Sequence, residues 1–137
     1  MKQNQRYSGC FIINSENKYL LQFRGPFWRT FPNTWCTFGG KIEEGETLTQ
    51  GLKRELKEEL NIIVDENKFH KKYSISFEEK EYNRSGTLNY FSYNITSKEI
   101  EKIKLFEGNG FGWFTFEEVM KLETTPNLKE ALKESFN

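Results

Sequence analysis

The segment Gly39–Ile62, GGKIEEGETLTQGLKRELKEELNI, contains the clearest structural element of this chain. Thr47 followed by Gln50 is a capping-box pair, which predicts that a helix begins here. Leucines recur at every fourth position and give the helix one apolar stripe: Leu48, Leu52, Leu56 and Leu60. Asn61 stands where a left-handed helix stop is expected, a conformation that Asn tolerates second only to Gly.

The same predicted helix carries three carboxylates, Glu55, Glu58 and Glu59. At about 100° per residue they share one arc beside the leucine stripe. Crowded carboxylates repel one another, and a hard divalent cation such as Mg²⁺ or Mn²⁺ relieves that repulsion. We expect Gly51, on the same arc, to leave room for a metal or phosphate, and Arg54 to orient Glu55 or offset its charge. The alternative interpretation is an ordinary solvated helix face.

The spacing of these residues resembles the signature of the Nudix hydrolases. Gly40 is followed after five residues by Glu46 and after seven more by the run Arg54–Ile62. Every charged position of the signature matches, and the one departure is Asn61 in place of the final Gly. The resemblance implies an α+β fold, a Nudix-type α/β/α sandwich with a mixed sheet and a central catalytic helix. It implies one such domain over residues 1–137.

The resemblance also implies an activity: Mg²⁺- or Mn²⁺-dependent hydrolysis of a nucleoside diphosphate linked to another group. Carried over by position, Arg54, Glu55 and Glu58 are the catalytic residues. Glu59 is a further metal ligand beside Glu55 and Glu58, and Gly40 offers its backbone carbonyl to the metal. Glu55 is either a ligand or the base that activates water. Glu46 would support the junction between the loop and the helix.

A further carboxylate from a later loop often completes sites of this family. Glu107, just before the strand expected at 111–114, is the candidate fifth metal ligand. Glu78, Glu79 and Glu81 compete with it for this role, and a plain turn acid is the alternative.

Substrate contacts are expected from the ring-rich loop 25–34 before the signature. Phe27, Trp28 and Phe31 are candidates to flank a base or sugar, since stacking on an aromatic ring is worth about 1–3 kcal/mol per base. Arg24 and Arg29 are candidates to meet phosphates or a sugar. The alternatives are packing for the rings and plain surface charge for the arginines. A fourth ring, that of Trp35, is expected to pack inside.

The segment from Trp35 to Glu46 resembles the MutT-type branch of the family, although Phe38 replaces the Pro that usually precedes Gly-Gly. That branch converts nucleoside triphosphates, including oxidised ones, to monophosphate and pyrophosphate. A nucleotide-sugar hydrolase is the alternative, favoured by the ten-residue loop 25–34. A non-catalytic nucleotide sensor is less favoured, because Glu55, Glu58 and Glu59 are all retained.

The composition of the chain argues against several classes of partner and site. The 20 Lys and Arg balance 20 Asp and Glu, which argues against stable nucleic-acid binding through a basic surface.

No apolar run approaches the length of a membrane span, and the polar N-terminus lacks a signal-peptide pattern, so we expect a cytoplasmic protein. Cys10 and Cys36 are too few for a disulfide framework. His70 is the only histidine, which disfavours a His-based zinc site. The sequence is silent on oligomeric state, although a homodimer is common in the family that it resembles.

Elements around the signature follow from patterns of apolar and turn residues. Strands are expected at 7–13, 18–24, 35–38, 62–64, 69–77, around Tyr82, and at 87–95, 103–105 and 111–114. Thr115 with Glu118 is a second capping box. Thr125–Pro126 predicts a last helix with Pro at its first position. This order of strands, one helix, strands and terminal helices predicts an α+β arrangement with a mixed sheet.

Overall fold

A mixed β-sheet forms the centre of the computed structural model, which describes residues 5–104 and 110–136. Within these ranges the sheet has seven strands in the order β3-β2-β1-β6-β5, with β4 also on β1 and β7 also on β2. Strands β1 and β6 run parallel, and the other pairs are antiparallel. The strands are β1 Gln5–Ile13, β2 Tyr19–Arg24, β3 Thr34–Cys36, β4 Phe38–Lys41, β5 His70–Glu79, β6 Arg84–Asn94 and β7 Phe111–Phe114.

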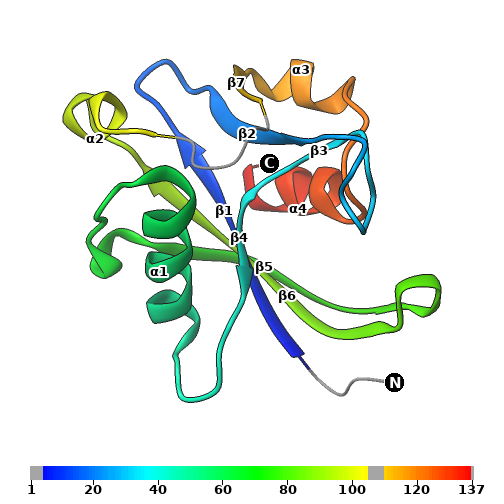
Figure 1. Ribbon diagram of the computed structural model, residues 1–137. Coiled ribbons are helices and arrows are strands. Elements are labelled where there is room, and N and C mark those ends of the chain that lie inside the picture. Colours follow the sequence, from blue (N-terminus) through cyan, green and yellow to red (C-terminus); the bar gives the residue numbers. More distant parts are fainter. Residues whose placement is uncertain (1–4, 105–109, 137) are drawn as a thin grey trace.

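Helices cover both faces of this sheet (Figure 1). Side chains of β1 alternate between two cores, as the two-residue period of a strand requires. Cys10 and Ile12 pack with α1 (Leu48–Leu60), whereas Phe11 and Ile13 pack with α3 (Phe116–Met120) and α4 (Leu128–Phe136). The predicted α/β/α sandwich with a mixed sheet is thus confirmed.

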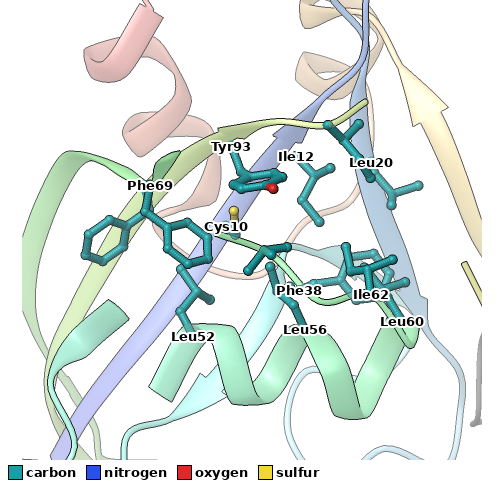
Figure 2. Packing of buried hydrophobic residues seen from close by; sticks show 13 residues of the cluster. Cys10, Ile12, Leu20, Phe38, Leu52, Leu56, Leu60, Ile62, Phe69 and Tyr93 are labelled. Carbon is teal, nitrogen blue, oxygen red and sulfur yellow. The ribbon is translucent and has the colours of Figure 1, made fainter. Parts of the chain in front are cut away.

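Helix α1 follows its sequence signals. Thr47 accepts a hydrogen bond from the Gln50 backbone N–H, and the Gln50 side chain completes the capping box. Asn61 ends the helix in the left-handed conformation, with φ 60°. The apolar stripe faces the sheet (Figure 2), and three of its leucines are fully buried: Leu52, Leu56 and Leu60. The helix is therefore fixed at both ends and along one face, which sets where its acidic arc lies.

Strand β4 leads the chain from the sheet into the loop before α1. One strand was expected at 35–38, but the chain instead breaks at Thr37 and continues as β4 through Gly39 and Gly40 to Lys41. Gly39 makes this possible, because its φ is +141° and an added Cβ would collide with the Ser8 carbonyl of β1. Pairing with β1 thereby carries the Gly-Gly segment into the sheet, directly beside α1.

Two of the expected strands have no regular secondary structure in the described residues. Residues 62–64 form no strand; Ile62 and Val64 are buried there while Ile63 is 72% exposed. Burial therefore alternates along these residues as it would in a strand, although they pair with no strand. Residues 103 and 104 are also irregular, and the Lys104 N–H donates to the Leu60 carbonyl. The last position of that expected strand, 105, lies outside the described residues.

Three further differences concern short helices. The segment around Tyr82 is a 3₁₀ helix, Lys80–Tyr82, at the tip of the β5–β6 hairpin. Helix α2 (Ser97–Glu101) was missed, although Thr96 and Glu99 form a capping box like the one confirmed at α3. Helix α4 begins at Leu128 rather than at Pro126, because residues 126 and 127 form a turn first.

Burial of the α1 stripe predicts a contrast between two aliphatic residues. Leu56→Ala should lower the free energy of unfolding by about 2–5 kcal/mol, because Leu56 is fully buried and truncation leaves a cavity. Ile63→Ala should change it by less than about 0.5 kcal/mol, since its side chain is largely exposed. Urea unfolding of both variants measures the difference. Equal losses would contradict the packing described for α1.

Candidate active site

Arg54 is the centre of the charged cluster on α1. Its guanidinium binds Glu46 through two contacts, Nε to Oε2 at 2.8 Å and Nη2 to Oε1 at 3.0 Å. Nη1 donates to Glu55 Oε1 at 3.0 Å and to Glu58 Oε2 at 3.4 Å. Nη2 also donates to the Lys41 carbonyl at 3.1 Å. One cation therefore offsets the acidic arc and ties the loop before α1 to the helix.

These contacts change the ionisation of the cluster. The Arg54 hydrogen bond holds the pKa of Glu46 at about 2. Burial raises the pKa of Glu55, while Arg54 opposes that shift. Glu46 thus supports the loop–helix junction as a permanent anion, and Arg54 holds Glu55 in one orientation.

Glu59 lies on the inner edge of the acidic arc. Its Oε1 accepts the backbone N–H of Gly39 at 2.9 Å. Burial raises the pKa of this carboxyl to about 8, although the Gly39 N–H and the Gln22 side chain lower it. Among the described residues no Lys or Arg forms an ion pair with Glu59. Glu59 is a buried carboxyl group without a cationic partner among the described residues.

The residues present fit a hard divalent ion. Their donors are carboxylate and backbone carbonyl oxygens, the ligands such ions take. Gly40 is packed so closely that an added Cβ would lie 2.8 Å from the Glu55 carboxyl carbon, so its backbone reaches the acid face without a side chain between them. Glu58 remains exposed on the same helix face. Burial without a cation at Glu59 is the feature that a bound metal would correct.

Glu55 and Glu58 turn toward Arg54, and among the described residues no three acidic, cysteine or histidine side chains are grouped so that they could hold a metal ion as they stand. One expectation about this face is wrong: Gly51 does not leave space for a metal or phosphate. An added Cβ there would meet Ile42 Cδ1 at 2.5 Å and Glu46 Oε1 at 3.0 Å, so this glycine permits close packing of the preceding loop on α1.

A pocket of about 270 Å³ adjoins Glu59. Its lining joins the Gly-Gly end of β4 to rings and charges from the loop 25–34 and the β5–β6 hairpin. The lining includes Tyr7, Gln22, Arg24, Trp28, Phe31, Gly39, Gly40, Glu59, Phe77, Glu79 and Arg84. One cavity therefore reaches both the acidic face and an aromatic wall.

The rings predicted to contact substrate divide into two groups. Trp28 and Phe31 line the pocket, whereas Phe27 is 97% exposed and does not. Phe31 has a φ of +47°, and its N–H donates to the Tyr82 hydroxyl at 3.2 Å. Trp35 packs edge-on against Phe114 at 4.8 Å between ring centres, as expected for an inward-facing ring.

The two arginines also differ. Arg24 lines the pocket but is already engaged: Nε donates to the Thr30 carbonyl at 3.0 Å, and its guanidinium lies 4.0 Å from the centre of the Trp28 ring. It therefore positions the loop and Trp28. Arg29 is exposed and does not line this pocket.

Glu107, the predicted fifth ligand, lies outside the described residues. Of its three competitors, Glu79 lines the pocket with Glu59, while Glu78 and Glu81 line a neighbouring hollow. Glu79 forms an ion pair with Arg84 at 3.5 Å. Burial raises the pKa of Glu79, and Arg84 opposes this.

Sequence reasoning missed several pocket residues, chiefly Tyr7, Gln22, Phe77 and Arg84. Their side chains come from β1, β2, β5 and β6, and no local spacing links them. The only sequence feature that links two of them is that Phe77 and Arg84 flank one short turn.

In the described ranges every helix is too short or too polar to span a bilayer.

Solved structures share this fold along nearly the whole chain. A MutT Nudix hydrolase from Burkholderia pseudomallei superimposes with a TM-score of 0.81 at 19% identity, covering 97% of this chain and 98% of that one. The MutT protein of Methanosarcina mazei Go1 gives 0.76 at 21% identity, over 97% and 94%. At these identities the likeness concerns the fold alone.

Curated relatives match over shorter segments. Nucleoside triphosphatase NudI of Enterobacter sp. (strain 638) is 41% identical over 56 residues, 41% of this chain and 40% of that protein. Oxidized purine nucleoside triphosphate hydrolase of Mus musculus is 54% identical over 44 residues, 32% and 27% of the two chains. The matches therefore span less than half of either relative. The NUDIX domain model, in contrast, matches residues 3–135, and by that match the chain belongs to the Nudix hydrolase family.

Proposed function

We propose that this protein is a divalent-metal-dependent hydrolase that cleaves a diphosphate linkage in a nucleoside triphosphate. The favoured substrate is a (d)NTP or an oxidised dNTP, and the products are the monophosphate and pyrophosphate. The observation that carries the proposal is that one pocket adjoins Glu59 and is also lined by Trp28 and Phe31. The names of the two curated relatives, both nucleoside triphosphate hydrolases, support the same class of substrate.

In this proposal Mg²⁺ or Mn²⁺ is held by Glu58, Glu59 and the Gly40 carbonyl, and of its two alternative roles Glu55 takes that of the base. Glu107 stays a predicted further ligand. A bound divalent ion neutralises phosphate charge and makes water more acidic. The chain's own part is orientation and proton transfer: Arg54 holds Glu55 at 3.0 Å, and Glu55 takes the proton of the attacking water as a general base.

Assay of the products tests the proposed reaction. The protein is incubated with Mg²⁺ and, separately, with dNTPs, oxidised dNTPs and nucleotide sugars. Release of monophosphate and pyrophosphate from a triphosphate supports the proposal. Release of a sugar phosphate would support the nucleotide-sugar alternative instead. Nucleotide binding without any cleavage would identify a sensor.

The metal ligands generate a first prediction on activity. Glu58→Gln and Glu59→Gln should each lower turnover by at least about 10²-fold with the fold intact, because an ion that stabilises the transition state contributes several kcal/mol. Steady-state kinetics and circular dichroism on the same preparations measure both properties. Glu101→Gln on α2 is the control, since Glu101 is exposed and far in sequence from the acidic arc. Wild-type turnover in both α1 variants would mean that this face is only a solvated surface.

A second prediction concerns the metal-free protein. The pKa of Glu59 rises from 4.5 to about 8 on folding, so the folded state holds a proton that the unfolded state has lost. Stability contributed by that proton is complete at low pH and is lost as the pH rises from about 4.5 to about 8. Melting temperature in excess EDTA should therefore fall over this range, and Glu59→Gln should flatten the fall.

Excess MgCl₂ provides the matching control for that experiment. A bound cation takes the place of the proton, so the wild-type decline should also shrink when Mg²⁺ is present. Identical pH profiles for wild type and Glu59→Gln in EDTA would contradict the assigned burial of this carboxyl.

A third prediction concerns the aromatic wall. Trp28→Ala should raise KM by roughly 5- to 150-fold, because a stacked ring contributes about 1–3 kcal/mol, when binding equilibrates before chemistry. Phe27→Ala is the matched control, since Phe27 is exposed outside the pocket, and its KM should not change. Kinetics and melting temperature are measured on the same samples. A large melting loss with unchanged KM for Trp28→Ala would assign that ring to packing.

A further inference from the structure

A second charged pair faces the same pocket, away from the acidic arc of α1. Glu79 ends β5 and Arg84 begins β6, and the two residues are partners across the hairpin. Glu79 Oε1 lies 3.5 Å from Arg84 Nη1. Both residues line the pocket that also reaches Glu59. The hairpin therefore presents one acceptor group and one donor group side by side.

The pair is incompletely satisfied. Glu79 Oε1 and Arg84 Nε are buried, and neither makes a hydrogen bond within the described structure. Native proteins leave few buried polar atoms in this state. Two such atoms on neighbouring groups of one pocket indicate a ligand that supplies both a donor and an acceptor.

The guanidinium of Arg84 is held in place by rings. It lies 4.8 Å from the ring centre of Tyr7 and 5.6 Å from that of Phe77. The opposite loop is fastened to the same hairpin, because Phe31 contacts Tyr82 through its backbone N–H and edge-on through its ring at 4.9 Å. The pair is thus positioned beside aromatic walls, which suits a flat ligand.

The charges of Glu79 and Arg84 favour the base of a nucleotide over its phosphates at this pair. Glu79 and Arg84 together carry no net charge, so a phosphate group would gain from the arginine and lose to the carboxylate. A neutral heterocycle with adjacent donors and an acceptor can bind both groups without repulsion from the carboxylate. The phosphates are better placed toward the acidic metal face, which leaves the base for the hairpin.

We propose that Glu79 and Arg84 read the Watson–Crick edge of a guanine base, a proposal that rests on the nucleotide-hydrolase function above. Guanine presents two adjacent donors, N1–H and the N2 amino group, to a carboxylate, and the O6 acceptor beside them to a guanidinium. Adenine presents one amino donor beside the N1 acceptor. Uracil and thymine have one N–H between two carbonyls. Guanine is the base that uses both oxygens of a carboxylate and the neighbouring arginine.

Binding of nucleoside monophosphates without metal tests this assignment independently of catalysis. Calorimetric titrations in EDTA compare GMP with IMP, which lacks only the N2 amino group, and with AMP. Wild type should bind GMP at least about tenfold more tightly than either, because a hydrogen bond to a charged group is lost with IMP. Equal affinities, or no detectable GMP binding, would overturn the proposal.

Glu79→Gln isolates the carboxylate. It should weaken GMP binding by about 10- to 100-fold and bring the GMP and IMP affinities together, because one amide oxygen replaces two acceptors. Glu78→Gln is the matched control and should leave the GMP/IMP affinity ratio unchanged, because the Glu78 side chain is exposed and forms only a 3.9 Å ion pair to Lys80. Equal weakening of GMP, IMP and AMP in Glu79→Gln would assign Glu79 to holding Arg84 instead.

The two proposals fail in different ways. Guanine-selective binding without triphosphate cleavage would contradict the proposed hydrolase and retain the base-reading pair. Cleavage of all triphosphates at equal kcat/KM, with no preference among monophosphates, would retain the hydrolase and remove Glu79 and Arg84 from base recognition.

Discussion

The cluster around Arg54 is the interaction on which the candidate site depends. Glu55 and Glu58 stand within one turn of each other on α1, an arrangement that destabilises a helix unless a cation offsets it. Arg54 contacts both, and its two-point contact with Glu46 fixes the loop that follows β4. The arginine therefore offsets the repulsion between the two acids and also aligns the loop with the helix.

The sheet provides a hydrogen-bond donor to Glu59, the acid of α1 that Arg54 does not contact. Pairing of β4 with β1 carries Gly39 to Glu59, so that a backbone N–H at 2.9 Å binds a carboxylate that no arginine or lysine of the described chain reaches. A pocket bounded by this carboxylate at the sheet and by Trp28 in the loop follows from that register. The acidic and aromatic parts of the site are adjacent because β2, which precedes the loop, also pairs with β1.

Local signals predicted the parts of the fold that local forces determine. The capping residues and leucine stripe of α1 act within a few residues, and the structure has them as expected. Ile62 and Ile63 belong to a run that looks like a strand in the sequence, yet these residues pair with no strand in the structure. Gly51 was misinterpreted because its close neighbour, Ile42, comes from the preceding loop. Arg84 was missed because its role arises only when the β5–β6 hairpin closes against β1.

The most direct test of the metal site is a titration of the isotope-labelled protein with Mn²⁺, followed by NMR. A paramagnetic ion broadens the amide signals of residues near it. If α1 and β4 hold the ion, the amides of Gly39, Gly40 and Glu59 should broaden first, at substoichiometric Mn²⁺, while that of Leu132 in α4 stays sharp. Sharp signals from these three residues at stoichiometric Mn²⁺, with broadening confined to acidic groups elsewhere, would contradict the account.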